Sequence, residues 1–209
     1  QGLPEEVWLS QPDGSGKIPI DSGGYFDFNS FRWSPDGARA LYVFGVFDAS
    51  GMYHETVRVN DLQGGKQDLF TVPTGDDYYY DALEWLGQNR ALLGTYRSWQ
   101  EDYRVQTIDT SGGGAHATLS DHAGTADLFP SPNGRSVAAV LRHDSFGPVL
   151  VQVFDVDGAA RLAYATASSP SCVPAVSGAV WSPDSTRVAF SERLVTYSEV
   201  PKPCPADTT

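Results

Sequence analysis

The sequence predicts an all-β protein built from repeated antiparallel sheets, and three observations support this fold class. A Trp-Ser-Pro-Asp turn between two apolar runs occurs twice, in residues 31–44 and 179–190. A second phrase, an apolar run that ends in a glycine-containing turn, recurs along the chain. The composition, with 21 Gly, 14 Pro and 41% hydrophobic residues, is that of a folded, turn-rich chain. Many short strands joined by tight turns fit all three observations.

The first phrase is a turn with an apolar strand on each side. Its four copies read RWSPDGARALYVF, EWLGQNRALLGTY, FPSPNGRSVAAVL and VWSPDSTRVAFSE, with the first turn position at Trp33, Trp85, Pro130 and Trp181. Proline fixes φ at the first corner of a turn, while Asp, Asn and Gly tolerate the conformations that follow. Each copy therefore predicts a β-hairpin.

The second phrase has the same spacing as the first. Its copies begin at Val7, Val57, Val105 and Val151, and their turn glycines are Gly14, Gly64, Gly112 and Gly158. Both phrases recur about every 50 residues, a period typical of repeat proteins. Each unit thus holds two hairpins, whose four antiparallel strands are called a, b, c and d. Trp33, Trp85 and Trp181 stand at the end of strand a, where we expect them to pack between neighbouring sheets.

A four-stranded sheet has two open faces, and radial stacking of such sheets in a β-propeller buries them. We therefore expect one domain, residues 1–209, that forms a propeller of four antiparallel blades. The blades are expected at residues 29–72, 80–120, 125–165 and 176–200, the last one completed by residues 7–20. Because the chain begins with strands c and d and ends with strands a and b, pairing of its two ends would close the ring. The alternative is that the four blades belong to a larger propeller of six to eight blades.

The repeat also resembles a known family. WSPDG followed by an apolar strand, and later an apolar strand with D-x-x-G, is similar to the WD40-like repeat of TolB-type β-propellers, a bacterial periplasmic family. The resemblance covers residues 7–192; it is intact in the first and fourth units and degraded in the second (WLGQN) and third (PSPNG). It implies a propeller fold, a periplasmic or extracellular location and protein partners. The motif itself is architectural and does not identify a function.

The charge of the chain excludes several partners. It has 14 basic and 26 acidic residues, a net charge of −12, and no cluster of Lys or Arg. Such a surface repels phosphate backbones and anionic lipid, so we expect no nucleic-acid binding. The apolar runs are strand-sized, so we expect no direct membrane insertion. Since the chain begins with Gln1, we expect either that a signal peptide has been removed or that the sequence starts inside a longer one.

The two cysteines predict a disulfide. Cys172 and Cys204 both lie in proline-rich segments near the end of the chain, and neither has a histidine nearby. This is a poor metal site, whereas a bond between the two would suit an exported protein. The alternative is two inert thiols.

The loops opposite the hairpin turns are rich in aromatic and acidic residues. Rigid rings beside carboxylates are typical of recognition surfaces, because they provide contact area at a low cost in entropy. We therefore predict a partner-binding patch made of Asp76, Asp77, Tyr78, Tyr79, Tyr80, Trp99, Glu101, Asp102 and Tyr103. The alternative for Tyr78 and Tyr80 is that they enter the next strand a and pack.

No catalytic or cofactor motif stands out. The chain has no G-x-S-x-G, no phosphate-binding loop and no dinucleotide fingerprint, and His54-Glu55 is not followed by the second histidine of a zinc helix. We therefore expect no catalytic residues, no metal and no cofactor. One catalytic alternative stays open, a pair of carboxylates from separate blades, with Asp27, Asp77, Asp127 and Asp144 as candidates.

The sequence thus favours an exported, non-enzymatic β-propeller. We expect it to act as a protein-protein interaction scaffold, or as an accessory subunit of a bacterial envelope or surface assembly. One alternative is a carbohydrate-active hydrolase or lyase that uses paired carboxylates. The other is the propeller portion of a larger peptidase, in which case the structure should contain an unpaired blade edge.

Overall fold

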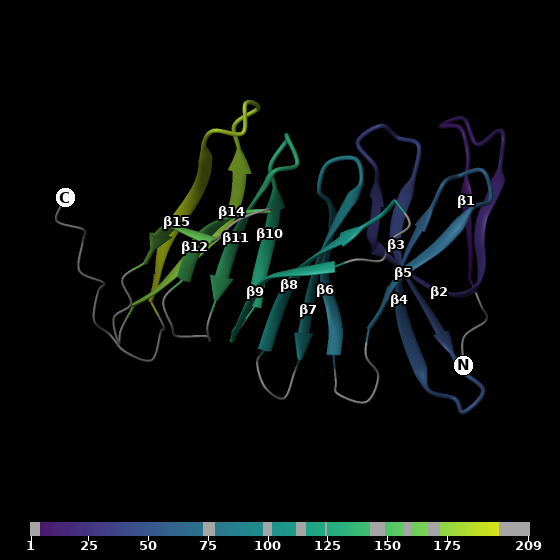
Figure 1. Ribbon diagram of the computed structural model, residues 1–209, viewed down its shortest axis with the longest axis horizontal. Helices are drawn as coiled ribbons and strands as arrows, with labels where there is room; N and C mark the ends of the chain where they lie inside the picture. The colour runs from purple at the N-terminus through teal and green to yellow at the C-terminus, as the bar shows by residue number, and fades with distance from the viewer. Residues whose placement is uncertain are drawn as a thin grey trace.

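The computed structural model describes residues 5–72, 78–97, 102–111, 116–123, 125–142, 149–156, 160–166 and 172–196. These residues form fifteen β-strands and no helix, and every strand pair is antiparallel. The sheets follow one another in chain order along an open arc, with β1 and β15 at opposite sides (Figure 1). The predicted all-β antiparallel class is confirmed. A helix long and apolar enough to cross a bilayer is absent from the described ranges.

The first sheet contains one strand that serves two partners. The sheet is formed by β1 (Glu5–Leu9), β2 (Ile18–Trp33), β3 (Ala40–Phe47), β4 (Tyr53–Asn60) and β5 (Lys66–Thr71), paired in that order. The first part of β2 pairs with β1, where Asp21 lies opposite Val7, and its last part pairs with β3, where Tyr25 lies opposite Gly45. β2 is therefore strand d of one unit and strand a of the next in one continuous segment.

The second and third sheets each have four strands in sequential order. The second consists of β6 (Tyr78–Trp85), β7 (Arg90–Arg97), β8 (Asp102–Asp109) and β9 (His116–Ala123). The third consists of β10 (Thr125–Pro130), β11 (Ser136–Arg142), β12 (Val149–Asp155) and β13 (Ala160–Ala165). The fourth has only β14 (Cys172–Trp181) and β15 (Val188–Thr196). In terms of the repeat, the arc thus begins with a c-d hairpin formed by β1 and the first part of β2. Three complete a-b-c-d sheets follow, and β14 and β15 form an a-b hairpin at the end.

The turn of the first phrase is closed by its serine. The Ser34 amide donates to the Arg39 carbonyl at 2.9 Å, and the Ser34 hydroxyl donates to Asp36 at 2.5 Å and accepts from the Arg39 amide. The hydrogen bond from Ser34 is the main reason why the pKa of Asp36 lies below its usual value. Gly37 then takes the left-handed conformation, with φ of 69°. The same closing bonds recur at Ser131 and Ser182, so the phrase forms the same turn in three sheets.

The core lies between consecutive sheets. Strand b is central in each complete sheet, and its residues Leu41, Leu92 and Ala139 are all fully buried. One apolar cluster joins the first and second sheets, another joins the second and third, and a third joins the third and fourth. Each sheet is therefore stabilised mainly by its neighbours in the arc, as in other repeat proteins.

An ionic network attaches the N-terminal hairpin to the first sheet. The buried carboxylate of Asp21 accepts hydrogen bonds from Tyr42 (2.7 Å), Arg58 (2.9 Å) and Lys66 (2.6 Å). Burial opposes ionisation of Asp21, but the hydrogen bonds from Lys66, Tyr42 and Arg58 outweigh it and hold its pKa below the usual value. Asn60 adds a bond to the carbonyl of Ile20 at 2.7 Å. Residues from β3, β4 and β5 thus hold the first part of β2.

The structure does not contain the closed four-bladed ring that we expected. β14 and β15 form a sheet of their own, and β1 pairs with β2 at the other end of the arc (Figure 1). Residues 7–20 therefore do not complete a blade with residues 176–200. The sheets instead follow one another in an arc that leaves β1 and β15 at opposite sides (Figure 1), so these two strands do not meet in this structure.

The tryptophans at the end of strand a have two different environments. Trp85 is 7% exposed, lies in the core between the first two sheets and donates from Nε1 to the Arg32 carbonyl at 3.1 Å. Trp181 packs between the third and fourth sheets and donates from Nε1 to the Phe129 carbonyl at 2.8 Å. The packing prediction is confirmed for these two. Trp33 is 47% exposed, because no sheet precedes it in the arc.

Candidate functional site

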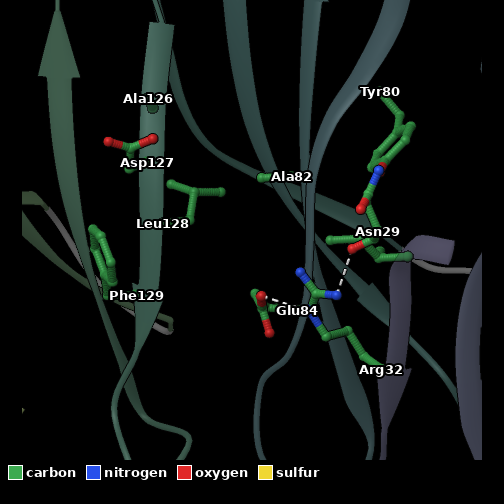
Figure 2. A pocket seen from close by; sticks show the side chains of 10 residues that line it. Asn29, Arg32, Tyr80, Ala82, Glu84, Ala126, Asp127, Leu128 and Phe129 are labelled. Atoms are coloured by element: carbon green, nitrogen blue, oxygen red, sulfur yellow. Dashed lines mark hydrogen bonds and ion pairs between the residues drawn. The ribbon is translucent and has the colours of Figure 1, made fainter. Parts of the chain in front are cut away.

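A pocket of about 400 Å³ lies where the strands a of three consecutive units, β2, β6 and β10, run side by side. Figure 2 shows the side chains that line it. From β2 they are Asn29 and Arg32, from β6 Tyr80, Ala82, Leu83 and Glu84, and from β10 Ala126, Asp127, Leu128 and Phe129. The pocket exists because strand a of each unit, here β2, β6 and β10, contacts strand a of the next.

An ion pair forms the wall of the pocket between the first two sheets. Arg32 Nε lies 2.7 Å from Glu84 Oε1, and both side chains are about one third exposed, at 35% and 31%. The guanidinium also donates to the carbonyls of Asn29 (2.6 Å) and Phe31 (3.1 Å). Figure 2 shows Arg32 and Glu84 pointing toward each other from β2 and β6. The backbone bonds of Arg32 hold its guanidinium in place, so this wall presents fixed charges of both signs.

A tyrosine on β6, four residues before Glu84, and an aspartate on β2 also join the same two sheets. The Tyr80 hydroxyl donates to Asp27 Oδ2 at 2.5 Å, and Tyr80 is half-buried. Burial and the Asp27 carboxylate both disfavour the phenolate, so the pKa of Tyr80 is well above its usual value. Tyr80 therefore stays protonated and acts as a hydrogen-bond donor rather than as a base.

The far wall of the pocket is built on β10. Leu128 extends from this strand into the space toward β6 (Figure 2), and it packs in the core of the second and third sheets. The Asp127 carboxylate lies 2.7 Å from Arg142, which also donates to the Val176 carbonyl at 3.0 Å. With a side chain that is 51% exposed, Asp127 keeps a solvent-accessible acidic surface. The pocket is therefore lined by both apolar and charged side chains.

The predicted partner-binding patch is only partly described. Tyr80 lines the pocket, and the backbones of Tyr78 and Tyr79 pair with Arg97 and Tyr96 in β7. The side chains of Tyr78, Tyr79 and Asp102 lie outside the described part of the structure, as do Asp76, Asp77, Trp99 and Glu101 altogether.

Tyr103 is not at the surface. It is fully buried in the core between the second and third sheets, and a Cβ atom added to Gly94 would lie 2.1 Å from its hydroxyl oxygen. The prediction that Tyr103 contacts a partner is therefore wrong. Side chains alternate between the two faces of a strand, and β8 directs this one to the core, where the absence of a side chain on Gly94 leaves room for the ring.

The other candidate residues are only partly described, and the structure does not bring Asp27 and Asp127 together. Cys172 opens β14 opposite Thr196, but Cys204 lies outside the described residues, so the predicted disulfide does too. Asp27 and Asp127 lie on β2 and β10, with the second sheet between them, and Asp77 and Asp144 are not described. Among the described residues no group of three or more His, Cys, Asp or Glu is arranged to hold a metal ion.

Sequence reasoning missed Arg32 and Glu84. Each stands immediately before the first turn position of its unit, so the two occupy equivalent places in consecutive repeats. Equivalent places on adjacent strands a lie next to each other, and opposite charges there predict an ion pair between the sheets. The alignment of the first phrase contained this signal, although neither residue resembles a known motif.

Comparison with known proteins identifies the fold. No protein-family model and no curated protein matches the sequence. Among solved structures, the chain is similar to prolyl oligopeptidase B from Galerina marginata bound to a 25mer macrocyclization substrate, with a TM-score of 0.53 and 12% identity. A second structure of that enzyme, bound to a 35mer hydrolysis and macrocyclization substrate, has a TM-score of 0.52 and 12% identity. Both matches cover 90% of this chain.

The similarity is one of fold alone. The chain spans about a quarter, 27%, of the length of these prolyl oligopeptidases. At 12% identity the match supports a propeller-like arrangement of antiparallel sheets and carries no residue roles across. These structures are not TolB-type proteins, so the family resemblance seen in the sequence stays a prediction.

Proposed function

We propose that this chain is a peptide-recognition module of β-propeller type that carries out no chemistry itself, and that the pocket across β2, β6 and β10 is its binding site. The observation that carries this proposal is the combination of apolar side chains and fixed polar groups in one pocket. Apolar surface with a few oriented polar groups is the usual composition of a ligand site. A site that crosses three strands suits an extended segment better than a compact small molecule.

The charges favour a basic peptide. Arg32 and Glu84 neutralise each other, and Asp127, whose side chain is 51% exposed, is the most accessible carboxylate of the pocket although it pairs with Arg142 at 2.7 Å. The chain as a whole has a net charge of −12. Its field attracts cationic partners and speeds their association. We therefore expect an extended peptide segment with Lys or Arg side chains, presented by a partner protein or as a free substrate.

The fold likeness supports the choice of a peptide. The two similar structures are prolyl oligopeptidases bound to a 25mer and a 35mer substrate. The sequence contains no G-x-S-x-G nucleophile motif. The proposal therefore covers two settings, an exported scaffold that binds a partner protein and the propeller portion of a larger peptidase. In both, the described sheets contribute recognition.

The test is a binding measurement with labelled, unstructured peptides of equal length and opposite charge. Fluorescence anisotropy should show that the basic peptide binds and the acidic one does not. Asp127→Asn should weaken binding of the basic peptide about tenfold, since hydrogen bonds to charged groups contribute about 1.5–3 kcal/mol. Glu6→Gln, which changes an exposed carboxylate on β1 to an amide, is the matched control and should leave binding unchanged.

Two outcomes would contradict the proposal. Equal binding of both peptides would show that the pocket does not select by charge, and an unchanged affinity in Asp127→Asn would place the site elsewhere. Mass spectrometry of the peptide after incubation separates recognition from catalysis. We expect the peptide to be recovered intact.

A further inference from the structure

An exposed group of large side chains lies at the end of the first sheet where β3 leads into β4. Phe47 is 45% exposed, Met52 50% and Tyr53 40%. The ring of Tyr25 on β2 packs against the rings of Phe47 and Tyr53, with centroids 5.7 Å and 6.4 Å away, and those two rings are 5.2 Å apart. These four side chains are called the aromatic surface. Large side chains exposed together in this way are typical of a contact site for another molecule.

Asp48 and Gly45 fix the shape of the aromatic surface. The Asp48 carboxylate accepts a hydrogen bond from the Met52 amide at 3.0 Å and lies 2.8 Å from Nε2 of His54. Gly45 on β3 leaves room for Tyr53, because a Cβ atom added there would lie 2.1 Å from the Tyr53 hydroxyl oxygen. The rings are therefore positioned before a ligand arrives, which lowers the entropic cost of binding.

A glutamate beside the aromatic surface occupies a core position of the repeat. Two residues before the first valine of the second phrase, the first three units have Glu55, Tyr103 and Val149. Tyr103 is fully buried and Val149 is 4% exposed, each in the core between two sheets, whereas Glu55 is half-buried. A carboxylate at such a place costs free energy that an apolar residue would not, and this favours a role in binding over one in packing.

Glu55 also connects the aromatic surface to the pocket across β2, β6 and β10. The Tyr53 hydroxyl and the Tyr80 backbone both contact its carboxylate, and the Tyr80 side chain lines the pocket. Burial raises the pKa of Glu55, the contact with the Tyr80 backbone opposes this only in part, and the charge of Asp27 adds to the rise. A cation beside Glu55 would stabilise the ionised carboxylate. The aromatic surface and the pocket thus lie along one path.

The potential at the aromatic surface is negative. Burial raises the pKa of the Tyr53 hydroxyl, and the charges of Glu55 and Asp27 raise it further. The chain as a whole has a net charge of −12. A ligand that matches this place therefore combines a positive charge with a flat or apolar part that covers the rings.

The first sheet contains an internal example of such a match. Arg58 lies over the ring of Phe44, 3.8 Å from its centroid, while its guanidinium pairs with Asp21 at 2.9 Å. A guanidinium is planar, so it can stack on a ring and direct its N–H groups to a carboxylate at the same time. The ammonium of lysine is a compact point charge without a flat face. The aromatic surface beside Glu55 offers a ring and a carboxylate to an arginine from outside.

We propose that the aromatic surface and Glu55 bind an arginine side chain of the basic peptide whose neighbouring residues occupy the pocket. Because the peptide is that of the proposed function, this assignment rests on that proposal and adds a selectivity to it. Lysine at the same position keeps the attraction to Glu55 but loses the stacking on Phe47 and Tyr53. The first sheet therefore selects arginine over lysine.

The test compares two labelled peptides that differ only in their cation. Both are unstructured Gly-Ser peptides of equal length, one with arginine and one with lysine at every second position. Fluorescence anisotropy should show that the wild-type chain binds the arginine peptide about fivefold more tightly, since stacking of a cation on exposed rings contributes about 0.5–1 kcal/mol or more. Equal affinities for the two peptides would overturn the proposal.

Variants assign the preference to the aromatic surface. Tyr53→Leu and Phe47→Leu each keep an apolar side chain and remove a ring, so each should remove most of the arginine preference and leave the affinity for the lysine peptide nearly unchanged. Circular dichroism checks that both variants fold. Trp8→Leu removes a ring that is 49% exposed on β1 and is the matched control. A preference that survives in both folded variants would overturn the role of the rings.

A charge variant tests the carboxylate separately. Glu55→Gln keeps the shape of the side chain and its acceptor oxygen, and it should weaken binding of both peptides about tenfold. Glu6→Gln, an exposed carboxylate on β1, should leave both affinities unchanged. Equal affinities in wild type and Glu55→Gln would overturn the role of Glu55.

Asp127→Asn separates this proposal from the proposed function. If it weakens both peptides while the wild type does not distinguish arginine from lysine, the pocket binds basic peptides and the arginine site is wrong. If it has no effect while the preference depends on Tyr53, the arginine site stands and the pocket is not part of the binding site. Binding of neither peptide would overturn both proposals.

Discussion

The carboxylate of Asp21 shows how a single side chain can position a hairpin. Its oxygens lie within hydrogen-bond distance of Tyr42, Arg58 and Lys66, one residue from each of the strands β3, β4 and β5. Arg58 also pairs with Asp68 and lies over the ring of Phe44, 3.8 Å from its centroid. The guanidinium is thus held from three sides, and the side chain of Asp21 is buried without being left unsatisfied.

We expect Asp21→Asn to lower the free energy of unfolding by about 3 kcal/mol at neutral pH, because the change leaves the buried cation of Arg58 short of a partner. The folded-state pKa of Asp21 is lowered, so its contribution is present above the unfolded pKa and is lost as the pH falls through the lower folded value. The difference between wild type and variant should therefore shrink below about pH 4. Urea unfolding at several pH values measures it, and a pH-independent difference would contradict the ionic origin.

The hairpin turns are the elements that the sequence predicts best, because a turn depends on a few adjacent residues. Ser34, Ser131 and Ser182 each close the turn that their phrase predicts. The burial of Tyr103 could not be predicted in the same way, since it depends on Gly94 in the neighbouring strand. The pocket depends on three strands from three units, and the aligned charges of Arg32 and Glu84 were its one local signal.

Two glycines at the same turn position allow a matched comparison of backbone strain and packing. Gly37 and Gly134 both have positive φ, 69° and 66°, but a Cβ on Gly37 would meet nothing within 4 Å, whereas one on Gly134 would lie 2.6 Å from the Cα of Gly87. We expect Gly37→Ala to cost about 1 kcal/mol for the strained conformation alone. Gly134→Ala should cost about 3 kcal/mol, because it also pushes the second and third sheets apart.

Thermal unfolding of the two variants measures this difference. Similar losses of stability would show that the contact between the turns of the second and third sheets relaxes easily. A larger loss in Gly37→Ala would contradict the argument.

At the scale of the whole molecule, an open arc makes stability uneven. Among the described residues, the second and third sheets have a neighbour on each side, whereas β14 and β15 contact a sheet on one side only. The sequence predicted the succession of sheets but not the position of the ends. Closure of a propeller ring depends on the angles between successive sheets. Small packing effects set each angle, and the angles add up over the whole chain.

We expect amide hydrogen exchange to follow this order. β7 and β11 should exchange most slowly and β15 much faster, because local opening needs less free energy where fewer buried contacts are broken. Uniform protection would mean that the terminal sheets are stabilised in some other way.

The ion pair of Arg32 and Glu84 also bears on how such a repeat could arise by gene duplication. The two residues occupy the same place in consecutive units. Newly duplicated, identical units would set guanidinium against guanidinium, or carboxylate against carboxylate, at this joint. The third and fourth units have Phe129 and Val180 at this place, so an apolar residue there would avoid the repulsion. Wherever neighbouring units keep a charge at this joint, however, the two must differ in sign, and that requires them to diverge.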